Sequence, residues 1–218
     1  MSTYTGDVVP GGPPDVRQLP GLVVRKISVE DTDNNCYLLT CSATGRQALV
    51  DAAGDAPRLL DLVRSTGDAL DVVVTTHQHW DHHRALADVV AATGARTAAG
   101  ADDADALPVP VQQRLAHGDR VEFGRVALDV VHLRGHTPGS VALVARAGGT
   151  HLFTGDSLFP GGVGRTTSPQ DFASLLQDVQ ERLFGCYDDA AWVYPGHGRD
   201  TTLGAERPSL PEWRARGW

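Results

Sequence analysis

The most distinctive stretch of the sequence reads Thr76-His77-Gln78-His79-Trp80-Asp81-His82. It holds three imidazoles and one carboxylate within six consecutive positions, a pattern typical of a metal site and not of an ordinary polar loop. An irregular turn can direct His77 and His79 toward one cation, and a following turn that opens a helix can direct Asp81 and His82 toward another. The stretch therefore predicts two neighbouring metal ions.

The segments on both sides of this stretch predict a layered α/β fold. Residues 70–75 are mostly apolar, as in a strand, and lead directly into Thr76, and Leu86, Val89 and Val90 follow with helical spacing. The order strand, loop, helix is typical of layered α/β proteins, whose ligands gather at the carboxyl ends of strands.

Similar patterns extend this prediction over most of the chain. Further strands are expected at residues 22–29, 36–41, 47–51, near 96, and at 121–130, 140–146, 150–154 and 191–194. Further helices are expected around Leu59, Leu60 and Val63 and, after a Ser168 cap, along Phe172, Leu175, Leu176, Val179 and Leu183. We expect an extended Pro/Gly-rich lead over residues 1–21, a single domain over 22–218, and within it a surface connection over 101–118.

The composition argues against several classes of function. The chain has 218 residues, a formal charge of −8 and a single lysine, Lys26, so binding to nucleic acid is not expected. The sequence lacks a secretory signal and an apolar run of membrane-spanning length, which favours a cytoplasmic protein without a membrane partner. In that compartment Cys36, Cys41 and Cys186 are expected to be reduced thiols in the core. The oligomeric state stays open.

Three further stretches place a metal-ligating side chain among small residues, each at the end of an expected strand. They read Gly135-His136-Thr137-Pro138-Gly139-Ser140, Thr154-Gly155-Asp156-Ser157-Leu158-Phe159 and Pro195-Gly196-His197-Gly198. A neighbouring glycine lets the backbone turn sharply and come close to an ion. Each stretch alone is weak evidence, but their order after the histidine stretch is specific.

With these motifs the chain resembles the metallo-β-lactamase superfamily, and within it the compact bacterial hydrolases of the glyoxalase II (hydroxyacylglutathione hydrolase) type. The resemblance extends from about Asp33 to Thr202. It implies a four-layer αβ/βα sandwich of two mixed β-sheets flanked by helices. It also implies a first metal site of His77, His79 and His136, a second of Asp81, His82 and His197, a bridging carboxylate from Asp156, and a supporting role for Asp51 in orienting a ligand or its loop.

This ligand set predicts a binuclear hydrolase. Imidazole and carboxylate ligands without thiolate suit Zn(II), with Fe or Mn as further candidates. Two such ions, with Asp81 and Asp156 among their ligands, can share a hydroxide that attacks a carbonyl carbon. Because a thiolate can leave without prior protonation, the expected substrate is a small-molecule thioester, either S-lactoylglutathione or its mycothiol analogue.

The glycine-rich stretch after Asp156 bears on the substrate. Residues 159–167 resemble the loop that follows the bridging aspartate in glyoxalase II, where a basic residue at the position of Arg165 holds the carboxylate of the thiol carrier. Thr167 stands where the family often has a carrier-binding tyrosine, and the family's C-terminal helical domain is not expected after His197. Both departures count against glutathione itself.

Other residues near the motifs have ordinary interpretations. We expect His83 beside the site or in solvent, His117, His132 and His151 at ordinary polar positions, and Trp80 packed beneath its loop. Trp213 and Trp218 either cover an apolar groove or form a subunit contact.

Several other functions stay open at this point. A persulfide dioxygenase would use one iron held by two histidines and an aspartate. A lactonase or β-lactamase would open a cyclic ester or amide, and a module with a vestigial site would bind metal without catalysis. A flavodiiron-type oxidoreductase needs a flavodoxin domain, for which this chain has no room.

Overall fold

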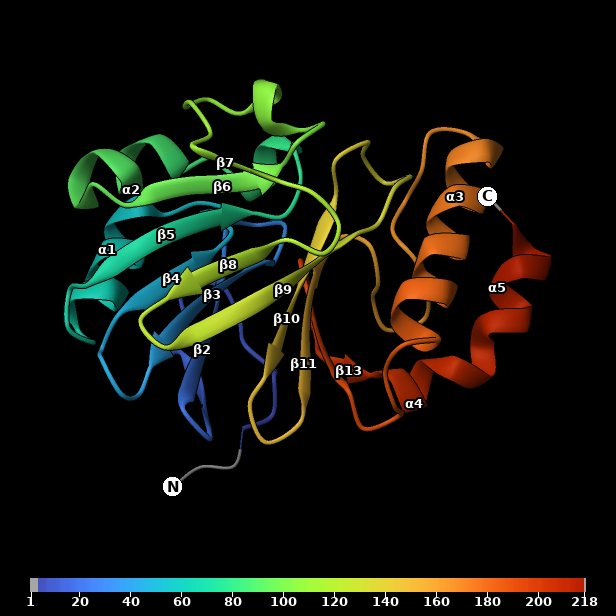
Figure 1. Ribbon diagram of the computed structural model, residues 1–218, viewed down its shortest axis with the longest axis horizontal. Coiled ribbons are helices and arrows are strands. Elements are labelled where there is room, and N and C mark those ends of the chain that lie inside the picture. Colours follow the sequence, from blue (N-terminus) through green and yellow to red (C-terminus); the bar gives the residue numbers. More distant parts are fainter. Residues whose placement is uncertain (1–3, 218) are drawn as a thin grey trace.

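Two mixed β-sheets pack face to face, and helices cover the outer face of each (Figure 1). The computed structural model of the protein describes residues 4–217. Helices α1 (Ala56–Arg64) and α2 (Leu86–Thr93) pack on the first sheet, whereas α3 (Pro169–Val179) and α5 (Leu210–Arg216) pack on the second. The expected sandwich of two mixed sheets flanked by helices is confirmed.

Within residues 4–217 the first sheet has seven strands, which are neighbours in chain order. They are β1 (Asp15–Leu19), β2 (Leu22–Val29), β3 (Asn34–Cys41), β4 (Gln47–Val50), β5 (Leu70–Thr75), β6 (Arg96–Gly100) and β7 (Gln113–Leu115). Neighbouring strands are antiparallel from β1 to β4 and parallel from β4 to β7. Since β4, β5 and β6 are parallel, the loops that follow β4 and β5 open at the same edge of the sheet.

The second sheet has six strands among the described residues, in the order β13–β12–β11–β10–β9–β8. They are β8 (Arg120–Phe123), β9 (Val126–His132), β10 (Val141–Arg146), β11 (Thr150–Gly155), β12 (Trp192–Pro195) and β13 (Thr201–Thr202). Strands β11 and β12 are parallel, and the other neighbours are antiparallel. The remaining elements are a π-helical turn after α3 (Gln180–Phe184), α4 (Leu203–Glu206), and short 3-10 turns at Trp80–His82, Ala104–Ala106 and Arg207–Ser209.

Strand β5 shows why its sequence is almost continuously apolar. Val72 and Val74 point into the core between the two sheets, while Val73 points toward α1 and α2. Alternate residues of a strand face opposite sides, and both sides of this strand are covered. The strand that carries the histidine stretch is therefore anchored in two cores at once.

The start of α3 follows the predicted cap. The Ser168 side chain accepts a hydrogen bond from the Asp171 backbone N–H at 3.1 Å, and Pro169 occupies the first turn. This cap satisfies a backbone donor that the first turn of a helix leaves without a partner. Leu175, Leu176 and Val179 then face the second sheet, as their spacing predicts.

Besides the two-residue β13, two strands lie in segments for which the sequence predicts no strand of a sheet. Residues 15–19 of the expected lead form β1, which pairs with β2 from Asp15↔Lys26 to Leu19↔Leu22. Residues 113–115 of the expected surface connection form β7, which is parallel to β6. Both strands are short and polar, so their pairing depends on the neighbouring strand rather than on their own pattern.

Two side-chain predictions are wrong. Trp80 does not pack beneath its loop but is 65% exposed, and the Arg84 guanidinium lies 3.7 Å from the centre of its ring. A stacked guanidinium covers one face of an indole without burying it. Cys186 is exposed, whereas Cys36 and Cys41 lie in the core as expected; all three are unpaired thiols.

The C-terminal helix closes the core beneath α3. Trp213 is 1% exposed and packs edge-to-face with Phe184 at 6.3 Å between ring centres, so it covers an apolar surface of its own chain. Trp218 lies outside the described residues. Among residues 4–217, every helix is too short or too polar to cross a lipid bilayer.

Candidate metal centre

Four loops at one edge of the sandwich bring seven candidate ligands together. The histidine stretch follows β5, Asp156 follows β11, His197 follows β12, and His136 lies in the connection between β9 and β10. Parallel strands end at a common edge, which explains how residues up to 120 positions apart in the chain meet.

We call His77, His79 and His136 the first group. Their nearest ring nitrogens all lie within 4.8 Å of one another. His77 Nε2 and His136 Nε2 are 3.3 Å apart, and His77 is 1% exposed. This arrangement offers three imidazole nitrogens to one point.

We call Asp81, His82 and His197 the second group. Their ligand atoms also lie within 4.8 Å of one another. His82 Nε2 is 3.1 Å from His197 Nε2, which in turn is 3.4 Å from Asp81 Oδ2. His82 is fully buried. The second group combines two imidazoles with one carboxylate.

Asp156 lies between the two groups. Its Oδ2 is 3.5 Å from His136 Nε2 and 3.5 Å from His197 Nε2, and its Oδ1 is 3.3 Å from His82 Nε2. One carboxylate therefore reaches ligand atoms of both groups, which is the place of a bridging ligand.

The orientation of the imidazoles fits bound cations. In four of the five histidines Nδ1 faces a protein oxygen, so an N–H there leaves the Nε2 lone pair pointing into the site. The contacts are His77 Nδ1–Thr76 Oγ1 at 3.0 Å, His82 Nδ1–Asp51 Oδ2 at 2.9 Å, His136 Nδ1–Arg165 O at 2.6 Å and His197 Nδ1–Thr32 O at 2.8 Å.

The spacing of the donor atoms fits as well. A tetrahedral ion with nitrogen ligands at about 2.0–2.1 Å would separate neighbouring ligand atoms by about 3.3 Å. The Nε2 pairs at 3.3 and 3.1 Å are close to that value. Asp156 Oδ1 is buried, and within the described part of the chain its polar contact is with another candidate ligand atom, His82 Nε2 at 3.3 Å, so a cation between the two atoms would satisfy both. The residues present therefore suit a pair of divalent ions.

The candidate ligands differ in the direction in which the fold shifts their pKa values. Burial lowers the pKa of His82, but hydrogen bonds with Asp156 and Asp51 outweigh it and raise that pKa to about 10. For His77 burial prevails and holds the pKa well below its usual range. Burial raises the pKa of Asp156, but contacts with His197 and His82 lower it strongly, so this carboxylate stays ionised.

Asp51, the expected supporting aspartate, holds Thr76, the first residue of the histidine stretch. Its carboxylate accepts hydrogen bonds from the Thr76 backbone N–H at 2.7 Å and the Thr76 hydroxyl at 2.9 Å, besides the contact with His82. Asp51 is 2% exposed and has a φ of 58°, an uncommon value for a residue other than glycine. That backbone turn directs the carboxylate under the loop.

Two buried residues that the sequence analysis missed tie the ligand loops together. Asn34 Nδ2 donates to Asp81 Oδ2 at 3.1 Å. Asp103 accepts hydrogen bonds from the Gln78 backbone N–H at 2.9 Å, the Thr137 hydroxyl at 2.5 Å and the Gly139 backbone N–H at 2.7 Å. Asn34 therefore braces the second group, whereas Asp103 joins the two loops that carry the first.

The other histidines lie outside the ligand cluster. His83 Nε2 is 3.1 Å from the Gln78 carbonyl oxygen, beside the site. His132 Nε2 is 2.7 Å from the Pro138 carbonyl oxygen, and His151 is buried with Nδ1 2.9 Å from the Tyr194 hydroxyl. Their contacts are structural.

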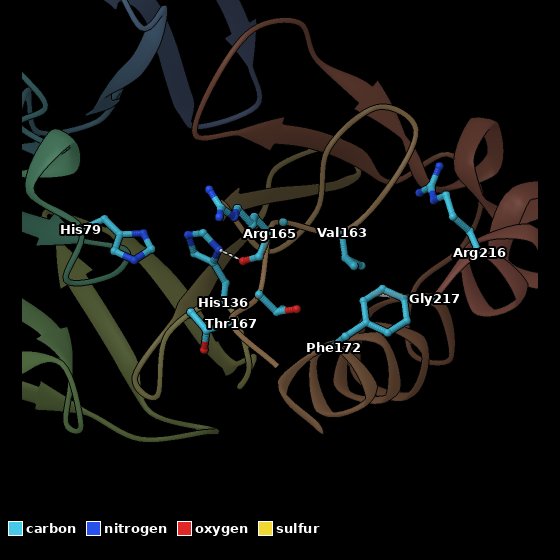
Figure 2. Close-up of a pocket in the computed structure, with 10 residues that line it drawn as sticks. His79, His136, Val163, Arg165, Thr167, Phe172, Arg216 and Gly217 are labelled. Atoms are coloured by element: carbon cyan, nitrogen blue, oxygen red, sulfur yellow. Dashed lines mark hydrogen bonds between the residues drawn. The ribbon is translucent and has the colours of Figure 1, made fainter. Parts of the chain in front are cut away.

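A cleft of about 690 Å³ opens beside the first group. His79 and His136 lie at one end, Arg216 lies at the other, and Val163 and Phe172 line the space between them (Figure 2). Arg165 lies next to His136, and its exposed side chain belongs to the same cleft. The cleft has the size of a small-molecule site and combines an apolar wall with two guanidinium groups.

Comparison with known proteins agrees with this geometry. The family model described as the metallo-beta-lactamase superfamily matches residues 29–197. The chain belongs to this superfamily. The match includes all seven candidate ligands, from His77 to His197.

Relatives within the superfamily include named hydrolases. A hydroxyacylglutathione hydrolase of Fuscovulum blasticum is 43% identical over 146 residues, covering 66% of this chain and 56% of that protein. The hydroxyacylglutathione hydrolase GloC of Haemophilus influenzae is 29% identical over 205 residues, covering 85% of this chain and 95% of that protein. The chain spans 51–59% of the length of the first three curated relatives that it matches.

A solved member of the fold has metal bound. TTHA1623, whose crystal structure is of a di-iron-bound form, has a TM-score of 0.72 and 31% sequence identity. The match covers 86% of this chain and 98% of that one.

Proposed function

We propose that this superfamily member is a binuclear metal-dependent hydrolase of the glyoxalase II type, which cleaves an S-acyl thiol conjugate. The observation that carries the proposal is the convergence of seven ligand side chains on two adjoining points, with Asp156 between them. The names of the hydroxyacylglutathione hydrolase relatives support the reaction class. The di-iron form of TTHA1623 supports the number of ions.

In this proposal the first group would hold one divalent ion, the second group would hold the other, and Asp156 would bridge them. Zn(II) is the leading candidate because four-coordinate imidazole and carboxylate sites suit it, and Fe or Mn would accept the same donors. When bound, the ions would supply a water of lowered pKa as nucleophile and a Lewis acid for the carbonyl oxygen.

The chain's own residues supply positioning. Asp51 fixes the ring of His82, and Asn34 fixes the carboxylate of Asp81, so the second group keeps its geometry through a turnover. The Arg165 carbonyl accepts a hydrogen bond from His136 Nδ1, which couples the glycine-rich loop of residues 159–167 to the first group. A change in that loop thus reaches a metal ligand directly.

The cleft supports an anionic thiol carrier as the substrate's second half. An acyl carbon between the two groups would leave the carrier lying along Val163 and Phe172, within reach of Arg165 and Arg216. Guanidinium groups form paired hydrogen bonds with carboxylates. This chemistry favours a carrier with free carboxylates, as in S-lactoylglutathione, with the mycothiol analogue as the competing substrate.

The test is a panel of substrates run beside elemental analysis of the purified protein. We expect close to two metal ions per chain and hydrolysis of S-D-lactoylglutathione or its mycothiol analogue. The same samples are given nitrocefin, a lactone, and glutathione persulfide with measurement of oxygen uptake. Turnover of one of these without thioester hydrolysis would contradict the proposal, as would a protein that binds fewer than two ions at saturating Zn(II), Fe(II) and Mn(II).

A further inference from the structure

The one lysine of the chain is buried on the first sheet. Lys26 lies in β2 and is fully buried. Its ammonium donates to the Asp200 carboxylate at 2.7 Å, to the Gly198 carbonyl at 2.6 Å and to the Gly6 carbonyl at 2.7 Å. All three donor hydrogens therefore have an acceptor.

This lysine acts on the loop that carries His197. Gly198 directly follows His197, with a φ of 65°, and its carbonyl also accepts from Asn35 Nδ2 at 2.9 Å. The Pro195 carbonyl, two residues before His197, accepts from the Tyr37 hydroxyl at 2.7 Å. Both ends of the loop are thus held by side chains of the first sheet.

The register of β2 and β3 places these side chains on one face. Lys26 is directly opposite Tyr37, and Asn35 is two residues from Tyr37 along β3. Directly opposite residues, and residues two apart in a strand, share a face of the sheet. Three polar groups in the interior between the sheets therefore converge on the four residues Pro195–Gly198.

Stability alone does not account for a buried ammonium here. Removing two charges from water costs several kcal/mol per ion, and well-packed apolar residues of similar volume often stabilise a fold as well or better. The Asp200 carboxylate has further donors in the Tyr4 hydroxyl at 2.6 Å and Trp192 Nε1 at 2.9 Å. An apolar replacement for Lys26 would lack the hydrogen bond to the Gly198 carbonyl.

We propose that Lys26 is a positioning residue for the second group: by holding the Gly198 carbonyl and the Asp200 carboxylate, it fixes the His197 loop and so sets the affinity of the second metal ion. This inference rests on the proposed two-metal function. It concerns one ion of the pair, because Lys26 has no contact with the loops of the first group among the described residues.

The test is a Zn(II) titration of metal-free full-length protein against a competing chelator, with Lys26→Met as the main variant. We expect the second ion to bind about 10–100-fold more weakly, the range seen when a partner of a ligand is removed, while the first ion stays within about twofold. Arg25→Met is the matched control. Arg25 directly precedes Lys26 in β2, points to the other face of the sheet and contacts Thr40. The control is expected to bind both ions as the parent does.

A second variant separates positioning from folding. Lys26→Met leaves Asp200 as an unpaired buried charge, whereas Lys26→Met with Asp200→Asn removes both charges and keeps an acceptor for Tyr4 and Trp192. We expect the double variant to recover thermal stability without recovering affinity for the second ion.

The outcomes separate the two proposals. A parent protein that binds fewer than two ions contradicts the proposed function. A parent that binds two, with unchanged second-ion affinity in Lys26→Met, overturns the role of Lys26. Recovery of that affinity in the double variant overturns it too, because Lys26 would then act only through stability.

Discussion

The first and second groups are held by the fold in different ways. The first group consists of imidazoles alone, and two of them, His79 and His136, line the cleft. The second group includes a carboxylate and lies against the first sheet, where Asn34 contacts Asp81 and the Thr32 carbonyl accepts from His197. The comparison teaches that one group adjoins the cleft, whereas the other contacts the first sheet through Asn34 and Thr32.

The largest effect is expected from substituting Asp156, the residue that contacts both groups. Asp156→Asn keeps the shape of the side chain and removes its charge, so we expect neither ion to stay bound through dialysis. The thioesterase rate should fall by more than about 100-fold, since the loss of a ligand's partner alone costs about 10–100-fold. Asp129→Asn is the control, because Asp129 is a carboxylate in the middle of β9 that pairs with Arg120 at 2.8 Å. Retention of two ions by Asp156→Asn would show that no bridge exists.

Removing one ligand from each group tests whether the groups are separable. His79→Ala and His197→Ala are each expected to lose one ion and keep the other, as measured by elemental analysis at matched free Zn(II). Only His79→Ala should also raise the KM for thioester, because His79 lines the cleft and His197 does not. Equal effects of both variants on KM would contradict the division.

Substituting the residues that support each group, Asp103 and Asn34, is expected to have a smaller and more selective effect on metal affinity. Asp103→Ala is expected to weaken the first ion by about 10–100-fold and Asn34→Ala to weaken the second by a similar factor. The physical reason is that each variant frees a loop or ligand on one side only. Titration with Zn(II) separates the two affinities, and a variant that weakens the opposite ion would reverse the assignment.

The smallest effect is expected at the cleft. Arg165→Gln should raise the KM for S-D-lactoylglutathione by up to about tenfold, the value of one charge-assisted hydrogen bond, with metal content unchanged. Only the side chain is altered, so the Arg165 carbonyl still accepts from His136. Arg120→Gln, which removes an exposed guanidinium paired with Asp129, serves as the control. An unchanged KM would remove Arg165 from the substrate site.

The seven candidate ligands could be singled out from the sequence because they occur in short motifs with a distinctive order. His77, His79, Asp81 and His82 lie in one stretch, and the remaining three stand beside glycines. One such glycine shows the reason in space, since a Cβ at Gly196 would lie 2.1 Å from Asp156 Oδ1. Strands such as β5 were predicted equally well, because both of their faces are covered and their sequence is mostly apolar.

Apart from Asp51, the supporting residues could not be predicted in the same way. Asn34 lies 47 positions from Asp81, and Asp103 lies 36 positions from Gly139, so their roles exist only once the chain has folded. Asp103 also stands in an acidic segment that is indistinguishable by composition from a solvated loop. Lys26 was noted only for its rarity, because burial of a lone lysine depends on acceptors that the sequence does not reveal.

The edges of the two sheets have a consequence for association between molecules. The outermost strands are β1 and β7 in the first sheet and β8 and β13 in the second, with lengths of 5, 3, 4 and 2 residues. An edge strand offers unpaired backbone groups to another chain, and a short one offers few of them. The sandwich can therefore keep its cleft open at one edge while it offers a foreign strand few backbone groups with which to pair.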